Sequence, residues 1–433
     1  MAEDAILLIS GVKGDTRRYR TLHAFEQLSL AGVRVKVAHI TDRDVSQQAA
    51  RAGVVILHRV ANNRLVEQLA RTAVRQNSLL ILDTDDYLYE PEVTRWIDSP
   101  DFSDPIRLGL YRTEILCHRE TLIQCHAVIA STGYLAGQLA QFGKPVFVHR
   151  NGFSRELLEI SEQAIHELHK PGNRTTIGYA SGTPTHNRDF EMIQPTLRSI
   201  LSRYEQVDLL LIGPLNIGNG WEGFESRIRQ VPLVSWRELP GWLAQFDINL
   251  APLVLSNPFS QSKSEIKYME AALVQVPTVA SPTDAFCHAI QSGITGLLSR
   301  DGAEWEQNLS QLIENSRLRQ SMGLAAHKAV VQQYNPGIRS LELVQTLNAI
   351  SDTVRQRTIF PVDEGLTARI ERNFGAASTG DAAKLNPAEP TLLQLGFYSL
   401  RYRGLTTLLG EIWVYLRRKL AFVFPFRTRS TPE

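Results

Sequence analysis

Residues 259–298 read FSQSKSEIKYMEAALVQVPTVASPTDAFCHAIQSGITGLL, and this pattern predicts a loop, a helix, a short strand and a second helix that ends in a glycine turn. Ser262 and Glu265 have the spacing of a capping box, so we expect the first helix to begin at Ser262. Three residues at helical spacing give it one apolar face: Ile266, Met269 and Leu273. The run from Val276 to Ala280 has the length and valine content of a buried strand.

Glu270 lies in the middle of this expected helix and is followed by two alanines. A carboxylate in this position can accept two hydrogen bonds from a diol such as a ribose. The helix N-terminus just upstream offers unpaired N–H groups and a positive dipole to an anion, and Lys263 and Lys267 add charge there. Together these features suit a nucleotide diphosphate. The alternative is a solvent-exposed Glu270 on a helix whose capping residues only cap it.

The segment from Lys263 to Ser281, together with the turn at 293–298, resembles the donor-binding signature of retaining GT-B glycosyltransferases, the group 1, family 4-like type. In that family the glutamate before the small-residue pair, here Glu270, holds the ribose of a nucleotide sugar. A second glutamate usually lies eight positions earlier, where this chain has Ser262, so the usual contact to the donor sugar is not carried over. The resemblance covers roughly residues 5–350. It implies hexosyl transfer with retention, with Lys263 and Ser264 at the donor.

Composition limits the alternatives. A chain of 433 residues with 43% hydrophobic and 21% charged residues predicts a soluble protein of two domains with an appendage. A net charge of +1 gives no reason to expect nucleic-acid binding. Three cysteines without metal-ligand spacing favour a reduced, cytoplasmic setting and predict no metal site: Cys117, Cys125 and Cys287. We expect no signal peptide and no membrane span.

Residues 1–152 have the pattern of a Rossmann-like domain, which the resemblance places on the acceptor side. A strand at Ala5–Ser10, a glycine loop and a helix from Arg17 to about Ala31 form its first unit. Further strands are expected at 33–40, 54–58, 79–83, 128–130 and 146–149. Gly11 and Gly14 would let this domain approach the donor, although two glycines can equally form a tight turn.

An acidic run, Asp83-Thr84-Asp85-Asp86, directly follows one of these strands, at the sheet edge where α/β proteins bind ligands. The resemblance implies that Asp85 or Asp86 orients or deprotonates the acceptor hydroxyl, with His58 as the reserve candidate. The same run also suggests a haloacid dehalogenase-like phosphatase that would use Asp83 and Asp85. That family has Thr or Val where this chain has Tyr87.

Residues 153–335 form a second Rossmann-like domain by the same criteria, which the resemblance assigns to the nucleotide-sugar donor. Its first strand, 176–179, runs into the loop Ala180–Arg188. In the family, this loop carries phosphate contacts. Four residues of this loop are the candidates here: Ser181, Gly182, His186 and Arg188. The alternative is a polar turn with no ligand. The segment 336–372 should return to the first domain as a helix.

Residues 373–433 differ in composition from the rest of the chain. A linker at 375–390 precedes an apolar stripe at helical spacing: Leu405, Leu409, Ile412, Leu416 and Leu420. Four aromatic residues accompany it: Trp413, Tyr415, Phe422 and Phe424. Residues 391–433 carry seven Lys/Arg and two Asp/Glu, so this tail has a charge of +5 and the remainder −4. The pattern favours an amphipathic helix on an anionic membrane, with packing against the body or a partner as the alternative.

These observations predict two doubly wound α/β domains that face a cleft, with an amphipathic helical tail. The predicted function is transfer of a sugar from a nucleotide sugar to a glycan or lipid-linked glycan, without metal or cofactor, at the inner face of a membrane. Helix N-termini and basic side chains would stabilise the leaving diphosphate. The competing hypotheses are a catalytically inactive GT-B scaffold that binds a nucleotide sugar, for which Ser262 is the argument, and the phosphatase.

Overall fold

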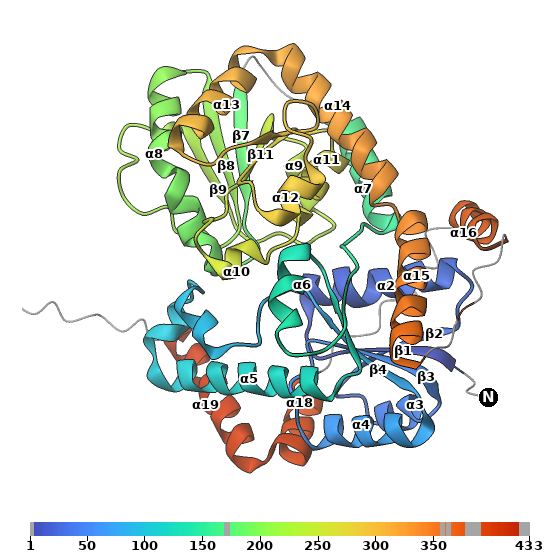
Figure 1. The fold of residues 1–433 in the computed structure, drawn as a ribbon. Helices are drawn as coiled ribbons and strands as arrows, with labels where there is room; N and C mark the ends of the chain where they lie inside the picture. The colour runs from blue at the N-terminus through green and yellow to red at the C-terminus, as the bar shows by residue number, and fades with distance from the viewer. Residues whose placement is uncertain (1–3, 169–173, 356–359, 361–364, 377–390, 424–433) are drawn as a thin grey trace, which may run out of the picture.

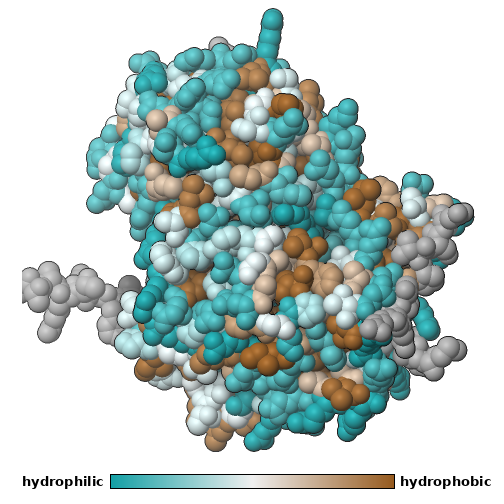
Figure 2. All heavy atoms as spheres, in the orientation of Figure 1, coloured by the Kyte–Doolittle hydropathy of each residue, from teal (hydrophilic) through white to brown (hydrophobic). Residues whose placement is uncertain are grey.

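The computed structural model describes residues 4–168, 174–355, 360, 365–376 and 391–423, which fold into two lobes (Figure 1). Each lobe is built on a sheet of six parallel strands with helices around it. The predicted fold class, two α/β units with parallel sheets, is confirmed. The space-filling view shows the lobes meeting at a waist where hydrophilic residues predominate on the visible face (Figure 2).

The first sheet has the strand order β2-β1-β3-β4-β5-β6. Its strands are Asp4–Ser10 (β1), Val35–His39 (β2), Ala52–His58 (β3), Leu79–Thr84 (β4), Ala127–Ala130 (β5) and Val146–Val148 (β6). Every residue of β4 is buried, because helices cover both faces of the sheet. Each fully buried leucine or isoleucine of such a strand stabilises the fold by about 1.5–3 kcal/mol. The main helices of this lobe are Val45–Ala49 (α3), Arg64–Gln76 (α4), Pro105–Gln124 (α5) and Gly133–Ala140 (α6).

The helix after β1 differs from the prediction of one continuous helix. Gly14–Arg17 (α1) is followed by a π-helical turn, Arg18–Leu22 (η1), and then by His23–Leu30 (α2). A π-helical turn shifts the phase of the following side chains and is common at functional sites. This turn buries Arg18, Tyr19 and Arg20, whose side chains reach across to distant parts of the chain.

The second sheet has the order β12-β11-β10-β7-β8-β9. Its strands are Thr175–Ala180 (β7), Val207–Ile212 (β8), Ile228–Val231 (β9), Ile248–Ala251 (β10), Thr278–Ala280 (β11) and Leu297–Leu298 (β12). The surrounding helices are Arg155–His166 (α7), Asn187–Arg203 (α8), Leu239–Leu243 (α9), Pro258–Gln261 (α10), Ile266–Leu273 (α11), Asp284–Ala289 (α12), Gly302–Glu314 (α13) and Ser316–Gln333 (α14). The strand order reverses between β7 and β10 in this sheet and between β1 and β3 in the first. Such points form ligand-binding crevices at the carboxyl ends of the strands.

The prediction that a helix begins at Ser262 is wrong by four residues, because α11 begins at Ile266. Ser262 instead follows the short helix α10, and its hydroxyl donates to the carbonyl of Phe259. Glu265 stands at the N-cap position, but its side chain caps nothing. The carboxylate is 1% exposed, accepts a hydrogen bond from Tyr334 at 2.9 Å and lies 3.7 Å from Arg150. The second residue of the expected capping box is therefore committed to a buried ion-pair network.

Helix α15, Pro336–Arg355, runs back from the second lobe onto the first (Figure 1). It packs on α2, and Ser340 donates to the Gln27 carbonyl at 2.6 Å. Gly365–Ala376 (α16) packs beside it.

The C-terminal part contains Leu392–Tyr398 (α18), a π-helical turn at Ser399–Arg403 (η6) and Leu405–Val423 (α19). Most of the predicted linker lies outside the described residues, as do Phe424 and the side chains of Leu420 and Phe422. Of the helices that the structure describes, none has both the length and the apolar composition to cross a membrane.

Candidate active site between the lobes

A cavity of about 410 Å³ lies between the lobes, at the points where both strand orders reverse. The first lobe contributes residues that follow β1, β3 and β4, among them Asp15, Arg59 and Asp86. The second lobe contributes the loop after β7, the segment before α11 and the first turns of α11. Both sheets therefore present the ends of their strands to one space, as the predicted cleft requires.

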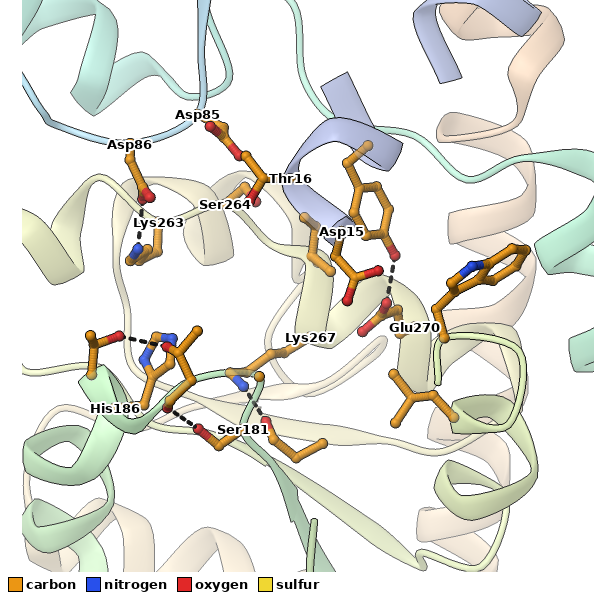
Figure 3. Close-up of a pocket in the computed structure, with 18 of the residues that line it drawn as sticks. Asp15, Thr16, Asp85, Asp86, Ser181, His186, Lys263, Ser264, Lys267 and Glu270 are labelled. Carbon is orange, nitrogen blue, oxygen red and sulfur yellow. Dashed lines mark hydrogen bonds and ion pairs between the residues drawn. The ribbon is translucent and has the colours of Figure 1, made fainter. Parts of the chain in front are cut away.

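Glu270 lines this cavity from α11 and faces the first lobe (Figure 3). Its carboxylate accepts a hydrogen bond from the Tyr19 hydroxyl at 2.5 Å and lies 3.7 Å from the Arg18 guanidinium. Burial raises the pKa of Glu270, although Arg18 and Tyr19 act in the opposite direction. An ionised carboxylate has about four lone-pair positions, so these contacts leave room for a diol.

Arg18 joins the lobes through aromatic contacts. Its guanidinium lies 4.3 Å from the centre of the Tyr19 ring and 4.7 Å from that of Trp236, which belongs to the second lobe. Trp236 is one of several apolar residues along this end of the cavity, with Val234 and Leu239. An aromatic and aliphatic wall beside a carboxylate fits a nucleoside, whose base needs a flat apolar surface and whose ribose needs an acceptor.

Lys263 lies at the other side of the cavity and forms an ion pair with Asp86 of the first lobe at 2.6 Å (Figure 3). Asp86 also pairs with Arg59. The Lys263 ammonium lies 3.9 Å from the centre of the Phe259 ring, which further restricts its position. Lys263, which was predicted to bind the donor, thus forms an ion pair with Asp86, which was predicted on the acceptor side. The ammonium group that a diphosphate would need is therefore neutralised by a carboxylate in this structure.

Of the other acidic candidates, Asp85 also lines the cavity. Asp85 pairs with Arg59 at 2.7 Å and lies 3.6 Å from His58. Burial would raise the pKa of Asp85, but the charge of Arg59 outweighs this effect and holds the pKa below its usual range. His58 is buried and does not line the cavity; its Nδ1 lies 3.2 Å from the Thr21 hydroxyl.

Asp83 does not line the cavity either. It is buried and forms a bidentate ion pair with Arg20 at 2.8 and 2.6 Å. A phosphatase nucleophile must reach its substrate, and this carboxylate is turned into the protein. The arrangement therefore gives the phosphatase hypothesis no accessible nucleophile.

The loop after β7 contributes three of its four predicted residues to the cavity: Ser181, Gly182 and His186. The Ser181 hydroxyl donates to the Thr183 carbonyl at 2.8 Å, and His186 Nδ1 lies 2.9 Å from Asp189. Burial lowers the pKa of His186, so its imidazole is neutral near pH 7. Arg188 is exposed and does not line the cavity. Ser264 lines it and accepts a hydrogen bond from Asn151 of the first lobe at 2.9 Å.

Gly11 and Gly14 were expected to let the first lobe approach the donor, but neither of them lines the cavity. Gly11 does not line the cavity; a Cβ atom on it would lie 2.2 Å from the Arg59 carbonyl oxygen, so the close approach is to the chain after β3. Gly14 has a φ of +72°, which favours glycine at the start of α1. Both glycines shape the segment that carries Asp15 and Tyr19 into the cavity.

Lys267, one turn after Lys263, points into the cavity (Figure 3). Its ammonium donates to the Ala180 carbonyl and lies 4.8 Å from the centre of the Tyr179 ring. Burial lowers the pKa of Lys267 to about 8, although the carboxylates of Glu270 and Asp189 oppose the shift. Lys267 is therefore a cation that titrates in an accessible pH range.

Binding of a nucleoside diphosphate such as UDP should weaken as the pH rises through 8. Below that pH Lys267 carries a charge that favours the anion, and above it the free protein must take up a proton to restore this charge. One linked proton limits the slope to about tenfold per pH unit. Calorimetry between pH 6.5 and 9.5 would measure it, and Lys267→Met should bind more weakly with a flatter profile. An unchanged slope in that variant would exclude Lys267.

Several residues of the site were not predicted from the sequence, above all Tyr19, Arg18, Arg59 and Trp236. Their positions depend on the π-helical turn and on how the lobes meet. Among the described residues, no group of three or more His, Cys, Asp or Glu is arranged to hold a metal ion.

Comparison with known proteins adds three findings. Residues 174–315 match the family model of glycosyl transferases group 1. No curated protein matches the sequence. Similar solved structures include HepE from Anabaena in complex with UDP and glucose, at 14% identity and a TM-score of 0.52, covering 80% of this chain and 100% of that one.

Two further structures have the same fold. Sucrose-phosphate synthase from Thermosynechococcus elongatus has 13% identity and a TM-score of 0.55, with 81% of this chain and 100% of that chain covered. A glycosyltransferase from Rickettsia africae has 12% identity and a TM-score of 0.52, with 82% and 100% covered. The second lobe thus contains the stretch that matches the group 1 glycosyltransferase model, and the two lobes together have the GT-B fold, which confirms the predicted two-domain architecture.

Proposed function

We propose that this protein transfers a hexosyl group from a nucleotide sugar to a glycan or lipid-linked glycan acceptor, with retention of configuration and without a metal ion. The observation that carries the proposal is the position of Glu270. It lies in a group 1 glycosyltransferase domain, lines the cavity between the lobes, and stands between an apolar wall and the two cations Lys263 and Lys267.

Each part of a nucleotide sugar then has a partner. The base would pack near Trp236, the ribose would bind Glu270, and the diphosphate would take Lys263 and Lys267. As the sugar leaves, negative charge grows on the diphosphate, and fixed ammonium groups stabilise it without a metal. UDP-sugars are the first donors to test, because HepE, which shares the fold, has been solved with UDP.

Release of UDP from UDP-glucose, UDP-galactose and UDP-N-acetylglucosamine, with and without added glycans, tests the proposal. We expect one donor to be consumed faster when an acceptor is present. Binding without any turnover across donors and acceptors would favour the inactive scaffold, for which the serine at position 262 remains the argument.

The C-terminal tail supports an acceptor at a membrane surface. On α19, four apolar side chains at helical spacing are each between 43% and 59% exposed: Leu405, Leu409, Ile412 and Leu416. On α18 and η6, four more are exposed: Leu392, Leu393, Phe397 and Leu400. The segment 391–433 has a charge of +5 on a body of −4. Each Lys or Arg near an anionic surface adds roughly 1 kcal/mol to binding, and inserted apolar groups add to this.

Replacing Leu409 and Ile412 with aspartate should abolish co-sedimentation with vesicles of phosphatidylglycerol and phosphatidylcholine at low salt. The substitutions remove exposed apolar side chains and add two negative charges, so both contributions to binding fall. The matched control is Leu324→Asp, since Leu324 is 54% exposed on α14 of the second lobe. Wild-type protein that stays in the supernatant would instead favour a tail that packs on a partner.

A further inference from the structure

A second cavity, of about 670 Å³, opens beside the first and is not part of the donor site. One wall is helix α5 and the segment before it, and the other is the tail helix α19 (Figure 1). We call it the tail groove. Its volume is in the range of sites for small organic ligands, roughly 300–1,000 Å³.

The tail groove is continuous with the cavity between the lobes. Ile97, Tyr111 and Thr185 line both spaces. Tyr111 also lies close enough to Asp86 for that carboxylate to contribute to raising the pKa of its phenol, after burial as the main cause. A ligand in the tail groove can therefore extend to the end of the donor cavity where Asp86 and Lys263 meet.

The lining of the groove combines aromatic rings with hydroxyl and carboxylate groups. Phe102 and Tyr111 lie with ring centres 4.9 Å apart, and Tyr415 on α19 is 44% exposed. Sugar rings present an apolar face of C–H groups, which packs on aromatic rings, and a rim of hydroxyls, which donate to carboxylates. Glu114 of α5 supplies such an acceptor: its side chain is 48% exposed, and its contact with the His118 ring, at 4.0 Å, is too long for a hydrogen bond.

The charges favour a neutral ligand over an anionic one. Three carboxylates and two guanidinium groups line the groove: Asp101, Glu114, Glu411, Arg107 and Arg403. Both guanidinium groups are already paired, Arg107 with Asp101 and Arg403 with Glu411. The carboxylate left over is Glu114, which would repel a phosphate. Among the described residues that line the groove, no guanidinium or ammonium group is left without a carboxylate for a phosphorylated ligand to bind.

Helix α19 has two different sides. Thr407, Glu411, Val414 and Tyr415 face the groove, whereas Leu405, Leu409, Ile412 and Leu416 lie on the opposite side at 3.6 residues per turn. The tail is anchored at the end of α18, where the Tyr398 hydroxyl accepts a hydrogen bond from Asn63 at 2.7 Å and the Tyr398 ring is buried in the core of the first lobe. Helix α19 is tied to this anchor through Glu411, which accepts from Ser399 at 2.6 Å and pairs with Arg403 at 2.5 Å. The tail therefore forms part of a binding site and does not merely extend from the body.

We propose that the tail groove binds the neutral saccharide part of the acceptor, so that the C-terminal tail completes the acceptor site. One part of this proposal rests on the glycosyltransferase function: the orientation of the bound saccharide, whose reactive hydroxyl would point toward Asp86. The groove itself, its wall on α19 and its preference for uncharged sugar rings follow from the lining residues alone.

Binding of methyl glucoside, methyl galactoside, maltotriose and cellotriose to the full chain, in the presence of UDP, tests the groove by saturation-transfer NMR and calorimetry. We expect at least one of these sugars to bind. Tyr415→Ala should weaken its affinity about tenfold, from the loss of the ring contact, and Glu114→Gln several-fold. Thr406→Ala, an exposed position on the same helix outside the groove, should change nothing.

Three outcomes would overturn the proposal: no binding of any sugar, binding that survives both groove variants, or tighter binding of glucose 1-phosphate than of the neutral sugars. UDP binding, measured separately by calorimetry, keeps the two proposals apart. If UDP binds and no sugar binds, the proposed saccharide site is wrong and the proposed donor site stands. If a sugar binds in a way that depends on Tyr415 and UDP does not bind, the saccharide site is supported and the proposed donor function is wrong.

Discussion

Replacing Glu270 with glutamine should weaken binding of the nucleotide donor by about 10- to 150-fold. A neutral amide loses the charge-assisted hydrogen bonds to two ribose hydroxyls, which are worth about 1.5–3 kcal/mol. It also loses one of the two carboxylates near Arg18, whose guanidinium lies 3.7 Å from Glu270 and 3.1 Å from Asp15. Calorimetric titration of the folded variant with UDP and with UDP-glucose measures the effect.

Glu265→Gln is the matched control, because this carboxylate stands five residues earlier and does not line the cavity. It pairs with Arg150 and accepts from Tyr334, so its loss should lower thermal stability while donor affinity stays within about twofold. Tyr19→Phe adds a second comparison, since it removes the hydroxyl that occupies one oxygen of Glu270. Unchanged donor affinity in a folded Glu270→Gln variant would remove this residue from the donor site.

The sequence was informative wherever local pattern determines structure. Apolar runs of strand length predicted β4 and β5 to within one residue, because a strand buried on both faces is apolar over most of its length. Glu270 could be singled out because one helix carries both the carboxylate and the alanines that pack beneath it, Ala271 and Ala272, both fully buried. The strand-end rule likewise placed Asp86 at the cavity.

Long-range partners could not be predicted from the sequence. Tyr19 is 251 residues from Glu270, and Lys263 is 177 residues from Asp86. The spacing of residues within one helix or loop carries no information about pairs that lie so far apart in the sequence. The π-helical turn at Arg18–Leu22 also has no signature in the sequence, yet it sets which side chains of that helix face the second lobe. The expected capping box failed for a related reason: the buried network around Glu265 outweighs a cap, which is worth about 1 kcal/mol.

Asp86→Asn should lower turnover at saturating donor by at least tenfold, toward the roughly 10²- to 10⁴-fold that general-base catalysis contributes. In the structure Arg59 and Lys263 each occupy one oxygen of the Asp86 carboxylate. If a diphosphate binds Lys263, as proposed above, it competes with Asp86 for this cation, and one oxygen of the carboxylate becomes available to an acceptor hydroxyl while Arg59 holds the other. The asparagine variant keeps the shape of the side chain but can neither take a proton nor orient the hydroxyl as strongly.

Donor affinity should stay the same or become tighter in Asp86→Asn, because Lys263 no longer has a competing carboxylate. Asp85→Asn should behave differently. Its carboxylate pairs with the largely buried Arg59, so that variant should mainly lose thermal stability. Turnover at saturating donor and donor affinity, measured separately for each variant, distinguish the two roles. A large loss of donor affinity with intact turnover in Asp86→Asn would assign this carboxylate to the donor site, and the acceptor hydroxyl would then need a different partner.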